Sequence, residues 1–398
     1  MKKITTKITR EGTAQSAPLT ASLPHLGGLT AKKFLRDYWQ KKPLLIRNAF
    51  AQFHEPLTKS EVLELAQRDE AESRIVSQSG KDWDLRHGPF SSRDFSALKK
   101  KLWTVLVQDT QHFSREAHEV LAKFNFIPHA RVDDLMVSYA VPGAGVGAHF
   151  DSYDVFLLQG MGSRRWQVSA QKDLRLKEGM PLKILANFKP EQEYVLETGD
   201  MLYLPPGYAH QGVAETECLT WSIGFRAPSQ QEMSAALLDF LRDEIQFEGQ
   251  YSDADLITTK HPGEIDRDMI GRMEKMLVDV RKMAADEDQL QKFLGTYLTE
   301  PKSHVYFDAP EPELSLPTFR QAIKRGGIEL DLKTRLFYIG ERFFINGEAL
   351  DVAAADNAAL RGLADARKLN RDAMASADAT SLAKTFYNAY RDGFVHPA

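Results

Sequence analysis

Two histidines and one aspartate near the middle of the chain have the residue types and spacing of metal ligands. His149 and Asp151 form a His-x-Asp pair within residues 146–156 (VGAHFDSYDVF), which we predict to be largely β-strand. Side chains two residues apart on a strand share a face, so both can point toward one atom. His210 ends a second segment, residues 199–210 (GDMLYLPPGYAH). Two imidazoles and one carboxylate on one side of a metal form the facial triad typical of non-haem Fe(II) oxygenases.

The second segment fits the cupin pattern Gly-x5-Pro-x-Gly-x2-His. Gly199 turns the chain into a strand, and the bend from Pro205 to Gly207 returns His210 toward the first pair. Ala214 stands where cupins usually carry an asparagine. A single histidine is more often structural, but the combined pattern favours a metal site. Nitrogen and oxygen ligands without sulfur allow Fe(II), Mn, Co or Ni and do not exclude Zn.

An Fe(II) oxygenase that uses 2-oxoglutarate also needs a cation for the far carboxylate of that cosubstrate. Arg164 and Arg165 lie on the next predicted strand, and a planar guanidinium binds a carboxylate through two parallel hydrogen bonds. Neighbouring strand residues point to opposite faces, so only one of the two arginines can enter the barrel. This alternation does not decide which one.

Short predicted strands surround these residues. A helix at 29–38, with Thr30 as its N-cap, precedes them. Glycine and proline turns divide the strands, which is typical of a double-sheet jelly roll of the cupin kind. The predicted strands are 43–47, 134–141, 149–159, 165–168, 193–196, 200–204 and 218–225.

Helices follow the strands. Segments 229–242, 265–284 and 286–299 have helical periodicity, and Ser229 and Glu232 have capping-box spacing. Apolar side chains of 265–284 form one stripe, which is either a core face or a methionine-rich interface between subunits. The members of this stripe are Ile270, Met273, Met276, Leu277 and Val280.

The section from about residue 300 predicts helices at 316–324 and 354–363 with a hairpin between them at Gly340 and Glu341. One hairpin among helices suggests a winged-helix domain. Acidic and basic side chains are almost equal in number in this section, whereas a winged helix that binds DNA is basic. We therefore expect it to serve structure or protein contact, without direct DNA binding.

The composition is that of a globular protein. The 398 residues are 43% hydrophobic and 27% charged with a formal net charge of −4, which predicts two or three domains and argues against phosphate-backbone binding as the main task. The one cysteine, Cys218, excludes a disulfide framework. The basic N-terminus lacks the apolar core of a secretory signal, and no run approaches the roughly 18 to 20 apolar residues that span a bilayer. We expect a cytoplasmic protein without a membrane partner.

Five segments together resemble those of the JmjC-type ribosomal oxygenases, most of all the bacterial branch that hydroxylates an arginine of ribosomal protein L16. The resemblance covers the chain from about Leu23 onward. The segments are 34–47 (FLRDYWQKKPLLIR), 134–143 (DLMVSYAVPG), 146–160 (VGAHFDSYDVFLLQG), 164–166 (RRW) and 222–228 (SIGFRAP).

The resemblance implies an α+β protein whose catalytic domain is a double-stranded β-helix, the cupin or JmjC jelly-roll barrel. With the composition, it predicts a flexible tail, the JmjC domain, a helical region that forms a homodimer, and a winged-helix-like domain. The expected boundaries are 1–22, 23–228, 229–299 and 300–398.

The resemblance also implies Fe(II) as the metal, with 2-oxoglutarate and O2 as cosubstrates. It places the C5 carboxylate of 2-oxoglutarate on Arg164. Ser138 and Ser222, on predicted barrel strands, either bond the cosubstrate or satisfy neighbouring backbone groups. The implied iron ligands, which are also the catalytic residues, are His149, Asp151 and His210.

The expected reaction is hydroxylation of the β-carbon (C3) of an arginine in a large-subunit ribosomal protein. A substrate guanidinium needs carboxylates, and Asp133 and Asp134 stand at the start of a predicted barrel strand, where they otherwise serve as a solvated pair. Asp154 is a second candidate. Two other hypotheses are a JmjC N-methyl-lysine demethylase and a non-catalytic cupin and winged-helix regulatory protein.

Overall fold

The structure is a computed structural model that describes residues 21–244, 248–375 and 379–398. The predicted tail therefore lies almost wholly outside the described residues. The chain divides into two compact units. The first runs to Ala227 and includes Ser303–Tyr306, and the second comprises Pro228–Lys302 and Phe307–Ala398.

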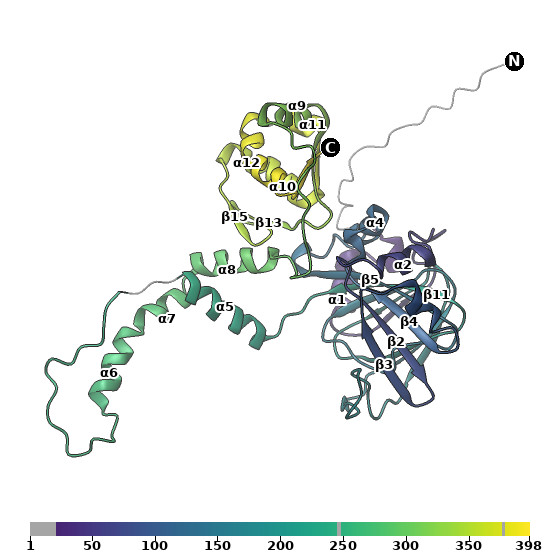
Figure 1. Ribbon diagram of the computed structural model, residues 1–398, viewed down its shortest axis with the longest axis horizontal. Helices are drawn as coiled ribbons and strands as arrows, with labels where there is room; N and C mark the ends of the chain where they lie inside the picture. Colours follow the sequence, from purple (N-terminus) through teal and green to yellow (C-terminus); the bar gives the residue numbers. More distant parts are fainter. Residues whose placement is uncertain (1–20, 245–247, 376–378) are drawn as a thin grey trace. The chain divides into compact units, whose positions relative to one another are not determined.

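An eight-stranded sheet and a three-stranded sheet form the first unit (Figure 1). The large sheet has the order β1-β9-β6-β11-β5-β4-β2-β3 and the small one β10-β7-β8. Their strands are β1 (Leu44–Ile46), β2 (Ser73–Ser79), β3 (Asp82–His87), β4 (Leu102–Val107), β5 (Val132–Ala140), β6 (Asp154–Gln159), β7 (Arg164–Ser169), β8 (Gln192–Leu196), β9 (Met201–Leu204), β10 (Ala209–Ala214) and β11 (Cys218–Phe225).

Short helices pack on one face of the large sheet, where side chains of alternate strand residues meet helix residues in a single apolar core. Leu135, Val137 and Tyr139 of β5 belong to that core. The residues between them, including Ser138, consequently face the opposite side, toward the small sheet. The helices and short 3-10 turns are η1 (Pro24–Leu26), α1 (Ala31–Asp37), α2 (Lys59–Leu65), α3 (Ser92–Ser96), η2 (Thr110–His112), α4 (Arg115–Ala122) and η3 (His129–Arg131).

The predicted N-cap of α1 is confirmed, because the Thr30 side chain accepts a hydrogen bond from the Lys33 amide. The predicted strand 149–159 is partly wrong, since regular pairing begins only at Asp154. β6 pairs with β9 up to Leu204, and the residue that follows, Pro205, has no N–H to continue the ladder. Residues 150–153 therefore form a loop.

Among the described strands of the first unit, four were not predicted: β2, β3, β4 and β10. Figure 1 shows β2 and β3 at the edge of the large sheet, which agrees with the strand order. Charged residues alternate along β3, which lies next to only one strand. An edge strand of this kind lacks the apolar run by which a central strand is recognised.

Helices α5 (Gln230–Glu244), α6 (Arg267–Met276), α7 (Val278–Ala284) and α8 (Glu287–Thr299) begin the second unit. The Ser229 side chain accepts from the Glu232 amide, as half of the predicted capping box requires. The predicted helix 265–284 is two helices that meet at Leu277. The apolar stripe along them is mainly exposed, so within this chain it is not a core face.

The rest of the second unit has its own apolar core, made by residues of helices and small sheets between Phe319 and Val395. The predicted hairpin at Gly340 is confirmed, because Gly340 takes a φ of +61° and β13 pairs with β14 across the turn. The elements are α9 (Leu316–Gly326), β12 (Gly327–Leu330), β13 (Leu336–Ile339), β14 (Arg342–Ile345), β15 (Glu348–Leu350), η4 (Ala354–Asp356), α10 (Asn357–Ala366), β16 (Lys368–Asn370), α11 (Arg371–Ala375), α12 (Ala379–Arg391) and β17 (Val395–Pro397).

Candidate metal centre

Backbone pairing brings together the two histidines, which are far apart in the sequence. His149 and His210 form an isolated antiparallel bridge in which each amide donates to the other residue's carbonyl, at 2.9 and 2.8 Å. Opposite residues of an antiparallel pair carry their side chains on the same face. The two imidazole centroids are accordingly 4.2 Å apart.

Asp151 completes the cluster from the loop before β6. Its Oδ2 lies 3.6 Å from Nε2 of His210, and one ligand atom from each of the three residues lies within 4.8 Å of the others. The Gly207 amide donates to the Asp151 carbonyl at 2.8 Å, which ties the loop to the turn before β10. The three predicted ligands therefore meet at one point, although Asp151 is held by a loop and not by a strand.

The hydrogen bonds of both histidines engage Nδ1, so Nε2 of each ring is the nitrogen available to a metal. Nδ1 of His149 lies 3.0 Å from the Gly147 carbonyl, and Nδ1 of His210 lies 3.0 Å from the Tyr208 carbonyl. A carbonyl oxygen only accepts, so each Nδ1 is a protonated donor, and Nε2 is the nitrogen that each ring can offer to a metal. Burial, followed by the nearby His149, lowers the pKa of His210 to about 4. Two imidazoles beside one carboxylate are a donor set that fits Fe(II).

Arg164 enters the interior and Arg165 points outward, which resolves the choice that alternation left open. Arg165 forms ion pairs with Glu215 at 2.6 Å and Glu193 at 3.8 Å on the exposed face. Arg164 is only 6% exposed. Its Nη1 lies at the limit of hydrogen-bond distance, 3.5 Å, from Ser138 Oγ. Among the residues that the structure describes, its Nε and Nη2 have no partner.

Ser138, Ser222 and Asp134 share the inward face of β5 and β11, because the residues between them belong to the helix-covered core. The Ser138 hydroxyl is 3.5 Å from the Thr220 carbonyl, which is a weak bond at best. The register of β5 with β11 is irregular between Val132 and Leu135, and the charges of both Asp133 and Asp134 contribute to the raised pKa of Tyr153.

Tyr153 is a residue of this region that sequence reasoning missed. Burial, followed by the charges of Asp151 and Asp134, raises the pKa of its phenol. A Cβ placed on Gly224 would lie 3.2 Å from Asp134 Oδ1 and 3.6 Å from Tyr153 Cε2, so these two side chains flank one spot beside the metal ligands. The signal was available, since Tyr153 follows Asp151 within the same short motif.

Asp154 is not available to a substrate, which corrects its place as a second candidate. It is fully buried and accepts hydrogen bonds from Tyr203 Oη at 2.6 Å and Gln40 Nε2 at 3.0 Å. Nη2 of Arg131 lies 3.5 Å away. As the first residue of β6, Asp154 points to the helix-covered side of the sheet, where internal partners occupy its carboxylate.

A double-sheet β fold that gathers two histidines and one aspartate near a buried arginine defines a metal-dependent oxygenase of the cupin class. Comparison with family models agrees. Residues 119–233 match the JmjC domain, and residues 282–395 match the ROXA-like winged helix.

Two bacterial relatives match along most of their length. The ribosomal protein uL16 3-hydroxylase of Escherichia coli (strain K12) is 32% identical over 322 residues, which are 80% of this chain and 84% of that protein. A probable ribosomal oxygenase of Haemophilus influenzae is 35% identical over 365 residues, covering 86% and 87%. The structure of YcfD, a ribosomal oxygenase from Escherichia coli, with cobalt and 2-oxoglutarate is 30% identical, has a TM-score of 0.79, and matches 92% of this chain and 98% of its own.

The chain therefore belongs to the JmjC-domain ribosomal oxygenases. Members of this family are Fe(II)- and 2-oxoglutarate-dependent hydroxylases, and the chain is an enzyme of that class.

Proposed function

We propose that the enzyme hydroxylates C3 of an arginine in a large-subunit ribosomal protein, with uL16 as the first substrate to test. The relative named a uL16 3-hydroxylase supports the substrate class. The observation that carries the chemistry is the convergence of His149, Asp151 and His210 within 4.8 Å. With iron bound, O2 and 2-oxoglutarate would convert a C–H bond to C–OH and leave succinate and CO2.

The chain's own residues have separable roles in this proposal. The three clustered side chains hold the metal. The hydrogen bonds from Nδ1 of the two histidines to backbone carbonyls fix the orientation of both imidazoles. Arg164 binds the C5 carboxylate of 2-oxoglutarate through the N–H groups of Nε and Nη2, which find no acceptor in the described parts of the chain, with Ser138 beside it. Ser222 is a further cosubstrate contact on the same inward face.

A carboxylate is needed to orient the guanidinium of the substrate. Asp134 is the better of the two proposed residues, since it shares the inward face with Ser138 and its carboxylate lies against the backbone at Gly224. Asp133 would act from the strand end as a longer-range attraction for a basic protein. Tyr153 lies where it can pack against the substrate side chain.

The proposed domains are a tail (1–22), the JmjC domain (23–228), a helical dimerisation region (229–299) and a winged-helix-like domain (300–398). Exposed apolar side chains on α6 and α7 support a homodimer through the helical region. Leu277→Asp should then give a monomer in analytical ultracentrifugation, whereas Glu274→Lys, also on these helices, should stay dimeric.

None of the described helices is long and apolar enough to cross a bilayer. The proposed compartment is the cytoplasm, where a ribosomal protein is met. The near balance of acidic and basic residues from Glu300 onward supports protein contact over DNA binding. We propose no membrane partner.

The test is mass spectrometry of ribosomal proteins incubated with the enzyme, Fe(II), ascorbate and 2-oxoglutarate. One added oxygen on an arginine, absent with His149→Ala, is the expected result. Arg165→Ala is a matched control on the same strand, and it should stay active. Loss of a methyl mass with release of formaldehyde would favour the demethylase. Absence of turnover for every substrate would favour the regulatory protein.

A further inference from the structure

The bridge between His149 and His210 has two faces, and only one carries the imidazoles. The residues before the histidines, Ala148 and Ala209, point to the other face because strand side chains alternate. Both alanines are buried in one small apolar cluster with Leu185. Leu185 is 2% exposed and comes from the loop between β7 and β8. We call residues 170–191 the cover loop.

The cover loop touches the metal-binding strand through backbone as well as side chains. The Leu185 amide donates to the Ala148 carbonyl at 2.7 Å. Ile184 packs against Gly147, where an added Cβ would lie 3.2 Å from its side chain. Gly147 in turn provides the carbonyl that accepts from Nδ1 of His149. The cover loop is thus one contact away from both histidines.

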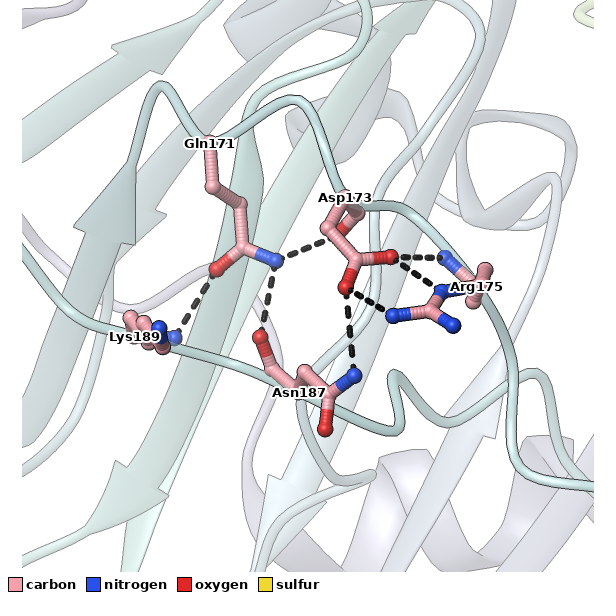
Figure 2. A network of polar contacts seen from close by, with 5 residues as sticks. All are labelled: Gln171, Asp173, Arg175, Asn187 and Lys189. Atoms are coloured by element: carbon pink, nitrogen blue, oxygen red, sulfur yellow. Dashed lines mark hydrogen bonds and ion pairs between the residues drawn. The ribbon is translucent and has the colours of Figure 1, made fainter.

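A polar network closes the base of the cover loop (Figure 2). The Asp173 carboxylate accepts from Nε and Nη2 of Arg175, both at 2.8 Å, and from Nδ2 of Asn187 at 3.1 Å. Gln171 binds the Asn187 carbonyl at 3.0 Å and accepts from the Lys189 amide at 2.8 Å. These bonds join the two ends of the loop.

The network and the apolar contact belong to one folded piece. The Ala186 amide donates to the Arg175 carbonyl at 2.9 Å, and Leu176 forms an isolated bridge with Leu185. The guanidinium of Arg175, followed by the amide of Asn187, holds the pKa of Asp173 well below its usual range. The carboxylate therefore stays charged throughout the range in which the protein would be assayed.

We propose that the cover loop, packed on the face of the bridge opposite the imidazoles, sets the spacing of the two histidines. Leu185 and Asp173 are then positioning residues for the metal. Leu185 packs in one buried cluster with both alanines, and the hydrogen bonds of Asp173 hold the loop that carries Leu185. Neither side chain reaches the metal ligands themselves, so the effect passes through the backbone of the bridge. This role rests on the proposed metal centre. It gives a function to the cover loop, which contributes no ligand to the facial triad.

The experiment is a Co(II) titration of metal-free full-length protein, followed by visible absorption, with thermal melting of the same metal-free samples. Asp173→Ala and Leu185→Ala should each weaken Co(II) binding by roughly 10- to 100-fold, the range known for residues that orient metal ligands. Leu185→Met should keep near wild-type affinity because it refills the space between the alanines.

Glu193→Ala is the matched control for Asp173→Ala. Glu193 also accepts from a glutamine and faces an arginine, yet it lies on the exposed face of β8. The Glu193→Ala variant should lower the melting temperature about as much as Asp173→Ala does and leave the Co(II) dissociation constant unchanged. A loss of metal affinity in Asp173→Ala that exceeds this control is therefore not a general stability effect.

The outcomes separate the two levels of the proposal. Wild-type protein that binds no Co(II) would overturn the metal centre and this role with it. Normal wild-type binding, with unchanged affinity in both Asp173→Ala and Leu185→Ala, would overturn the role of the cover loop alone. If Leu185→Ala does not fold, Asp173→Ala, which changes only the base of the loop, still decides the question.

Discussion

Replacing Arg164 by methionine should change stability and cosubstrate binding in opposite directions. Methionine has similar length and no donors, so it can fill the same space. The buried guanidinium has two N–H-bearing atoms, Nε and Nη2, without a partner among the described residues. Each buried donor left without an acceptor costs about 1–3 kcal/mol. Against this gain stands the loss of the cation–π contact with Trp166, 5.6 Å from its ring, at about 0.5–1 kcal/mol.

The two donor atoms together account for about 2–6 kcal/mol, and the lost ring contact offsets about 0.5–1 kcal/mol of this, so the free energy of unfolding of the cosubstrate-free protein should rise by about 1–5 kcal/mol in Arg164→Met. Binding should suffer. Two charge-assisted hydrogen bonds to a carboxylate contribute about 1.5–3 kcal/mol each, and every 1.4 kcal/mol is about tenfold in affinity. The dissociation constant for 2-oxoglutarate should then increase by roughly 10²- to 10⁴-fold.

Urea unfolding of Co(II)-loaded protein, with and without 2-oxoglutarate, measures both effects. Cosubstrate at 100 times its dissociation constant should stabilise wild-type protein by about 2.7 kcal/mol and Arg164→Met hardly at all. Arg165→Met, whose side chain points outward, should behave like wild type. A methionine variant that is less stable without cosubstrate and still gains stability from it would refute the reasoning.

Three further changes test other parts of the fold. Burial raises the pKa of Glu55 to about 7, so the folded protein keeps a proton that the unfolded chain loses above about pH 4.5. The free energy of unfolding should therefore fall by up to about 3 kcal/mol as the pH rises from about 4.5 to about 7. Urea unfolding of Glu55→Gln at about pH 5 and about pH 8 should show that slope removed; an unchanged slope would assign it to another group. Gly224→Ala crowds Asp134 and should raise the KM for the protein substrate while the dissociation constant of 2-oxoglutarate stays constant; the reverse pattern would place the substrate elsewhere. Tyr203→Phe removes the 2.6 Å bond to buried Asp154 and should cost about 1–3 kcal/mol of stability in urea, and a neutral effect would mean that Gln40 and Arg131 together satisfy the carboxylate.

The meeting of the three candidate metal ligands was predictable from the sequence because local rules fix most of their placement. Gly199 and Gly207 take φ of +89° and +78°, the left-handed backbone that the cupin pattern assigns to glycine. The hairpin at Gly340 was predictable for the same reason. In each case the identity of a turn residue predicts its backbone conformation. The candidate ligand or strand lies only a few residues away, so its position is predicted as well.

Placements that depend on distant pairing were beyond the sequence. Alternation showed that Arg164 and Arg165 oppose each other, but only the register of β7 with β10, where Arg164 faces Ala214, sends Arg164 inward. Asp154 was misjudged because only its closeness in sequence to the candidate ligands was considered, whereas alternation alone puts it on the face opposite Asp151. Long-range register carries information that spacing does not.

The inward face of β7 gives a reason for an anionic ligand that owes nothing to resemblance. More than nine-tenths of buried polar groups in folded proteins have partners, yet Arg164 and Trp166, two residues apart on that face, both keep buried donors without an acceptor among the described residues. The Trp166 ring lies 5.9 Å from that of His210. A ligand that brings acceptors would satisfy these donors, and a dicarboxylate is the simplest molecule that can serve the arginine and a metal together.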